Sequence, residues 1–69
     1  MRQISIIPKA PTARILLNAG AKRVSQPATD VFAEELEKIA EGIASKAVDF
    51  AKHSGRKTVQ EEDIKLAAR

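Results

Sequence analysis

Residues 26 to 54 read QPATDVFAEELEKIAEGIASKAVDFAKHS, and this stretch decides the fold. Its apolar residues recur at intervals of three and four, which is the period of a helix with one buried face. Ser25 suits the N-cap, Pro27 is tolerated in the first turn, and Gly55 ends the pattern. The stretch therefore predicts a single helix over about residues 26 to 54. Its repeating apolar positions are Ala28, Phe32, Leu36, Ile39, Ile43, Ala47 and Phe50.

This helix is too long for the chain that contains it. It would measure roughly 43 Å, whereas a compact globule of 69 residues is about 28 Å across. The rest of the chain can cover only part of its apolar face, and without cysteine no disulfide can compensate. We therefore expect an oligomer in which two long helices cross antiparallel near Gly42, where Ala40 and Ala44 permit close approach. The expected dimer core is Phe32, Leu36, Ile39, Gly42 and Ile43.

Two short helices are predicted on either side of the long one. Pro8 and Pro11 delay the first helix until about residue 10, and Gly20 supplies its stop because glycine tolerates positive φ. Thr58 and Glu61 fit the capping box of a third helix, with Thr58 as its N-cap. The expected fold class is therefore all-α, in the order short helix, long helix, short helix.

Composition narrows the class of protein. We expect one domain over residues 1–69, in which residues 1–8 form a flexible or extended N-terminal segment. One histidine and no cysteine argue against a structural metal site, and no apolar run is long enough to span a membrane. No nucleophile–base pair or phosphate-binding glycine loop occurs, so we expect no enzyme, cofactor or small-molecule substrate. The chain is expected to be a soluble intracellular protein.

The charges are distributed unevenly along the chain. All five charged residues of residues 1–24 are basic, whereas residues 25–54 hold six acids against three lysines. In the antiparallel dimer, residues 21–24 (AKRV) of one chain would lie beside residues 55–59 (GRKTV) of its partner. The resulting arc of positive groups would suit the phosphates of double-stranded DNA, although the same charges could be ordinary solvated surface. The candidate DNA-binding residues are Lys9, Arg14, Lys22, Arg23, Arg56, Lys57 and Thr58.

Two stretches carry a resemblance to a known family. Residues 13–25 (ARILLNAGAKRVS) and residues 51–67 (AKHSGRKTVQEEDIKLA) resemble archaeal histones, and the similarity extends over about residues 8 to 69. The resemblance implies a histone fold and an obligate handshake homodimer. It also implies stacked dimers that wrap DNA without sequence specificity, in the cytoplasm and associated with the chromosome. Histone paralogues are possible further partners.

The resemblance also implies roles for single residues in DNA binding. Histone octamers insert arginines into inward-facing minor grooves without base-specific contacts, and Arg14 and Arg23 would take this role. Lys57 and Thr58 would contact phosphates, with help from backbone amides at helix starts. Thr58 would in addition steady the groove-facing arginine across the paired loops.

Other implied roles concern assembly. Arg56 would pair with Asp63 and brace the second loop, and Gly20 would lie where neighbouring turns of a stacked superhelix approach. Dimers would join through a four-helix bundle at the end of the long helix, where a His–Asp hydrogen bond would respond to pH. The residues at this expected dimer–dimer interface are Phe50, His53, Asp63 and Leu66.

Several residues depart from the family pattern. Leu17 replaces a cation that many members carry, Lys9 stands in a stretch that is usually more apolar, and Arg2 adds charge to an N-terminal segment that is a few residues longer. The acids of the long helix (Glu34, Glu35, Glu37 and Glu41) are interpreted as a solvated face turned away from DNA. Two alternatives remain open: a histone-fold module for protein–protein contacts, and a helix-turn-helix regulator, although three acids in its reading helix would repel phosphates.

Overall fold

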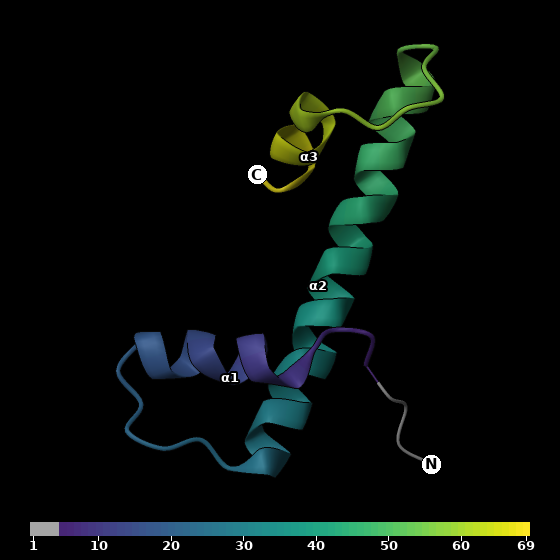
Figure 1. The fold of residues 1–69 in the computed structure, drawn as a ribbon. Coiled ribbons are helices and arrows are strands. Elements are labelled where there is room, and N and C mark those ends of the chain that lie inside the picture. Colours follow the sequence, from purple (N-terminus) through teal and green to yellow (C-terminus); the bar gives the residue numbers. More distant parts are fainter. Residues whose placement is uncertain (1–4) are drawn as a thin grey trace. The chain divides into compact units, whose positions relative to one another are not determined.

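The computed structural model describes residues 5–69, which form three helices and no strand (Figure 1). Helix α1 spans Lys9–Asn18, α2 spans Gln26–His53 and α3 spans Glu61–Ala67. The all-α class and the order short, long, short are confirmed. Of the N-terminal segment expected over residues 1–8, residues 1–4 lie outside the described part of the chain, and so does the extra cation Arg2.

Helix α2 has the length and the ends that the sequence predicts. It is continuous for 28 residues, which corresponds to about 42 Å. At its start the Ser25 hydroxyl accepts a hydrogen bond from the Ala28 amide at 3.1 Å, so Ser25 is confirmed as the N-cap. At its end Gly55 has φ 73°, and the amides of Gly55 and Arg56 bond back to the carbonyls of Lys52 and Ala51. This is a Schellman ending, which needs the positive φ that glycine tolerates.

The start of α3 corrects one sequence prediction. The N-cap is Gln60 rather than Thr58, because the helix begins only at Glu61. The Asp63 carboxylate accepts the Gln60 amide at 2.8 Å and thereby caps the helix two residues later than expected. The Thr58 carbonyl instead accepts a hydrogen bond from the Arg56 guanidinium at 3.1 Å, which keeps residues 56 to 60 in a loop.

The chain divides into two units within α2, between Lys38 and Ile39. Small residues fill the buried interior of each unit. Thr12, Thr29 and Ala33 are buried in the first, and Ala47, Ala51, Asp63 and Ala67 are buried in the second. Large apolar residues remain outside: Ile39 is 60% exposed and Leu66 is 49% exposed. A single chain therefore leaves much of the apolar face of α2 and α3 uncovered.

The five residues expected in the dimer core follow this pattern. Phe32, Leu36 and Ile43 are half-buried, while Ile39 and Gly42 are exposed. A side chain at Gly42 would meet nothing within 4 Å among the described residues, so the helix surface is open at the expected crossing point. The single-domain organisation stays a prediction.

Candidate nucleic-acid interface

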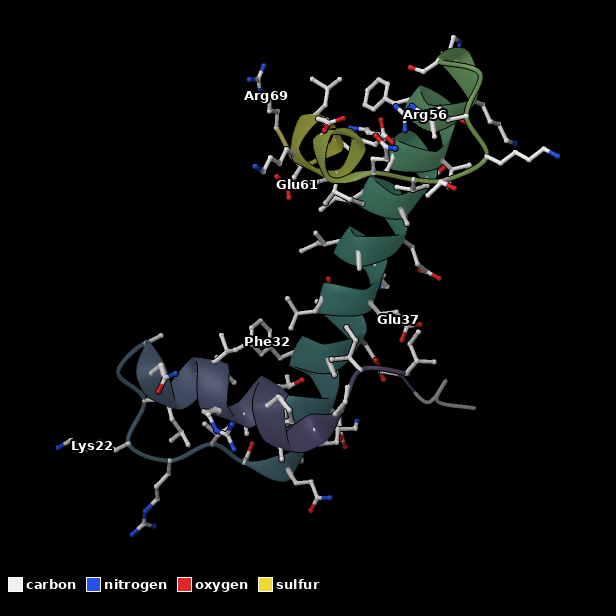
Figure 2. The ribbon with its side chains drawn as sticks, turned by 45° about the horizontal axis from the view of Figure 1, so that its top comes forward. Lys22, Phe32, Glu37, Arg56, Glu61 and Arg69 are labelled. Carbon is white, nitrogen blue, oxygen red and sulfur yellow. The ribbon has the colours of Figure 1, made fainter. Side chains whose placement is uncertain are left out.

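The first loop, residues 19–25, joins α1 to α2 and carries Lys22 and Arg23. Its start is shaped by a second Schellman ending: Gly20 has φ 119°, and the amides of Gly20 and Ala21 bond to the carbonyls of Leu17 and Leu16. Both cations are exposed, and neither makes a hydrogen bond or ion pair with residues 5–69. Lys22 projects away from the ribbon in Figure 2.

The second loop, residues 54–60, joins α2 to α3 and is closed by Arg56 and Asp63. Two parallel hydrogen bonds of 2.8 Å join their side chains, Nη1 to Oδ2 and Nη2 to Oδ1. Asp63 is only 4% exposed, and Figure 2 shows Arg56 turned toward α3. The hydrogen bonds from Arg56, followed by that from the Gln60 amide, lower the pKa of Asp63 from 3.8 to about 2. This bidentate pair braces the loop from within the second unit.

The candidate cations therefore fall into two groups. Lys9 donates from Nζ to Asp30 Oδ1 on α2 at 2.6 Å, and Arg56 is held by Asp63, so both are engaged within the chain. The other four are exposed and make no hydrogen bond or ion pair with the described residues: Arg14, Lys22, Arg23 and Lys57. From the sequence all six were candidates for DNA binding. The resemblance implied the Arg56–Asp63 pair, but nothing in the sequence indicated the Lys9–Asp30 pair.

One acid of α2 has a role that sequence reasoning missed. Glu37 Oε1 accepts the Ile6 amide at 2.7 Å and the Ser5 hydroxyl at 2.8 Å, and Ser5 is only 7% exposed. The Ile6 amide and then the Ser5 hydroxyl lower the pKa of Glu37. The interpretation of Glu37 as part of a solvated face is therefore wrong, because the N-terminal segment binds it. No local pattern could have indicated this, since one donor is a backbone amide 31 residues away.

The residues expected at assembly interfaces differ in exposure. His53 is the last residue of α2 and is exposed, with Nδ1 2.8 Å from the Asp49 carbonyl oxygen. Phe50 is half-buried, and a side chain at Gly20 would meet nothing within 4 Å among the described residues. The same part of the chain contains no group of three or more potential metal ligands and no helix that meets the length and hydropathy needed to cross a membrane.

Comparisons with known proteins agree with this geometry. Residues 6–68 match the family described as histone-like transcription factor (CBF/NF-Y) and archaeal histone. The chain is 59% identical over 63 residues to probable archaeal histone 3 of Methanocaldococcus jannaschii, covering 91% of this chain and 94% of that protein. The chain belongs to this histone family. It is also 48% identical to one subunit of the archaeal histone HAN1 of Thermococcus zilligii, with the same coverage.

Membership in the histone family accounts for the architecture. The three helices are those of the histone fold, and the resemblance seen in residues 13–25 and 51–67 is confirmed. Membership in this histone family implies a structural protein. Two features bear most directly on function: the uncovered apolar face, and the cations that have no partner among residues 5–69.

Proposed function

We propose that this histone-fold protein packages double-stranded DNA as a homodimer that binds with little sequence preference. The single observation that carries the proposal is the sorting of the cations: four exposed basic side chains, unpaired among residues 5–69, lie on α1 and on the two loops that bracket α2. Phosphate contacts are made by such side chains, and they fix position without reading sequence. The protein would then act in the cytoplasm, on the chromosome.

The dimer is proposed from the uncovered apolar surface. Ile39, Val48 and Leu66 are 60%, 40% and 49% exposed, and the buried hydrophobic residues of the described chain are alanines. Burying apolar side chains stabilises a fold by about 1.5 to 3 kcal/mol each, so a second chain would supply what one chain lacks. Crossing of two α2 helices near Gly42 would bring the first loop of one chain beside the second loop of its partner.

Within that dimer the unpaired cations have distinct proposed roles. Arg14 and Arg23 face minor grooves, while Lys22, Lys57 and Thr58 contact phosphates. Lys9 and Arg56 contribute less to DNA binding, since each is held by a carboxylate of its own chain. Binding then depends steeply on salt, because each neutralised phosphate releases counterions.

Larger assemblies are proposed through the end of α2. Phe50, His53, Asp63 and Leu66 of two dimers would form a four-helix contact, and Gly20 would permit close approach of stacked turns. Substituting His53 by alanine should leave dimers intact and abolish larger particles in sedimentation with DNA. Loss of the dimer itself would contradict this placement.

The decisive experiment combines binding with nuclease protection. Purified protein should bind unrelated duplex sequences with affinities that differ by less than about tenfold and fall steeply between about 50 and 200 mM salt. Nuclease digestion of the complexes should leave a regular ladder of protected fragments. Failure to bind duplex DNA at low salt would instead favour a module for protein–protein contacts, a second candidate because the matching family includes histone-like transcription factors.

A further inference from the structure

Residues 5–9 are attached to α2 at both ends of this stretch. Ser5 and Ile6 are held by Glu37, and Lys9 is held by Asp30. Ser5 Oγ also lies 3.3 Å from the Ala33 carbonyl oxygen. Because Asp30, Ala33 and Glu37 are spaced three and four residues apart, they share one face of α2. Residues 5–8 therefore form a strap that lies along this face before the chain enters α1 at Lys9, as Figure 2 shows beside the labelled Glu37.

The strap is bonded directly to the first turn of α1. The Ile7 amide donates to Ser5 Oγ at 3.1 Å, and the Pro8 carbonyl accepts the Thr12 hydroxyl at 2.6 Å. Thr12 is 1% exposed and is the largest fully buried side chain among the described residues. A hydrogen-bonded path thus leads from the Glu37 carboxylate through the strap to the helix that carries Arg14.

Apart from the Lys9–Asp30 ion pair, helix α1 has few other means of support at its start. It contains 10 residues, its N-cap Pro8 makes no side-chain capping bond, and its first turn has no acid. An isolated helix of this length is marginal in water, so its position depends on tertiary contacts. The hydrogen bonds to Glu37 are charge-assisted and correspondingly strong, so this residue anchors the N-terminal end of the strap.

We propose that Glu37 is a positioning residue for DNA binding: by clamping residues 5–7 to α2, it holds α1 in the place where Arg14 reaches the DNA. The inference rests on the proposed DNA-binding function. The proposal predicts a change in DNA affinity opposite to the change that net charge alone predicts. Removing an acid from a protein that binds a polyanion should strengthen binding through general electrostatics. Removing this acid weakens binding, because the contact of Arg14 is lost.

The test compares Glu37→Ala with Glu41→Ala. Both remove one negative charge from α2, but Glu41 is exposed and has no hydrogen bond or ion pair among the described residues. DNA affinity at about 0.2 M salt should fall about 4- to 20-fold in Glu37→Ala, as expected for one or two lost phosphate contacts per dimer. The slope of log K against log salt should become shallower by about 1 to 2. Glu41→Ala should bind as well as the unmodified protein or more tightly.

A second variant keeps the charge unchanged. Ser5→Ala removes the hydroxyl that donates to Glu37 and accepts the Ile7 amide, and it should weaken DNA binding about two- to fourfold. All variants are compared at a temperature where circular dichroism shows them fully folded. If Glu37→Ala does not fold, Ser5→Ala decides the question alone. A Glu37→Ala protein that binds DNA as tightly as Glu41→Ala, or an unchanged affinity in Ser5→Ala, would overturn the proposal.

Amide hydrogen exchange separates this proposal from the proposed function. In the free protein the Ile6 amide should exchange slowly, and it should exchange at least about tenfold faster in Glu37→Ala; this result requires no DNA. If the unmodified protein binds no DNA while Ile6 is protected, the proposed function fails and the strap itself stands. If the protein binds DNA and the Ile6 amide is unprotected, the positioning role of Glu37 fails and the proposed function stands.

Discussion

The two loops that bracket α2 use their basic residues in opposite ways. In the first loop, Lys22 and Arg23 are exposed and make no ion pair or hydrogen bond with residues 5–69. The loop is closed by backbone bonds after α1 and by the Ser25 cap of α2. In the second loop, the Arg56 side chain is turned inward and makes three hydrogen bonds, two to Asp63 and one to the Thr58 carbonyl. Lys57, the other cation of this loop, is exposed and makes no hydrogen bond or ion pair with the described residues.

This difference shows that a basic loop is not by itself a binding surface. Removing a cation that pairs with a buried carboxylate leaves that carboxylate buried without a partner, which destabilises the fold. Removing an exposed cation that has no partner changes stability little. Substituting Arg56 in the second loop should therefore lower stability, whereas substituting Arg23 in the first loop should lower DNA affinity. Substitutions at single cations test that separation, and the largest effect is expected in the second loop.

Replacing Arg56 by alanine should destabilise the protein most. Asp63 is 4% exposed and would lose the guanidinium that holds both of its oxygens, leaving a buried carboxylate without its partner. We expect thermal unfolding, followed by circular dichroism, to shift down by about 10 °C or more. Lys57→Ala is the matched control and should unfold within about 2 °C of the unmodified protein.

A double substitution sharpens this result. Arg56→Met combined with Asp63→Leu removes both charges and should be more stable than Arg56→Ala alone, because no unpaired buried charge remains. If Arg56→Ala and Lys57→Ala were equally stable, the two loops would not differ as the structure indicates.

Replacing Arg23 by alanine should weaken DNA binding and leave stability nearly unchanged. Thermal unfolding should change by less than about 2 °C, since the side chain has no partner among the described residues. DNA affinity at about 0.2 M salt should fall about 4- to 20-fold, and the salt dependence should become shallower by about one per site. Fluorescence anisotropy with several unrelated duplexes measures the DNA affinity and its salt dependence. A change in preference among the sequences would indicate base readout and contradict a purely backbone contact.

The second loop should also respond to acid in a defined window. Arg56 lowers the pKa of Asp63 from 3.8 to about 2, so the folded state binds fewer protons than the unfolded state between these values. The stability that the pair contributes is therefore complete above about pH 4 and is lost as pH falls through about 2. The difference in unfolding temperature between the unmodified protein and Arg56→Ala should narrow over this range. A constant difference from about pH 5 to about pH 2 would show that Asp63 titrates normally.

The sequence predicts what local patterns determine. The ends of α1 and α2 follow from Ser25, Gly20 and Gly55, because capping and positive φ are set by neighbouring residues. The start of α3 could not be predicted in the same way. Thr58 with Glu61 and Gln60 with Asp63 both fit a capping box locally, and the structure forms the second. The same Asp63 carboxylate is held by Arg56 seven residues away.

Longer-range partners were harder still to predict. Lys9 pairs with Asp30 at a separation of 21 residues, and Glu37 binds Ser5 at a separation of 32. Neither spacing reflects a helical or strand period, so composition and periodicity assign these residues only a generic charge. The candidate DNA-binding set did not separate engaged cations from unpaired ones, because that distinction depends on partners remote in the chain.

The smallest effect is expected at Lys9, which extends the comparison of engaged and unpaired cations to α1. Its pair with Asp30 is partly exposed, with side-chain exposures of 45% and 22%, so Lys9→Met should lower the unfolding temperature by less than about 5 °C. Arg14, on the same helix, is unpaired among the described residues and serves as the contrast. Arg14→Met should weaken DNA binding about fourfold or more at about 0.2 M salt.

Lys9→Met should change DNA affinity by less than about twofold at about 0.2 M salt, because its ammonium is already neutralised by Asp30 and Glu37 still holds Ser5 and Ile6. A fourfold loss at Lys9 would instead mean that DNA displaces Asp30 from the ammonium. Asp30→Asn distinguishes the two cases. It frees Lys9 and removes a negative charge, so it should strengthen binding if Lys9 can reach a phosphate, and do little more than Glu41→Ala if it cannot.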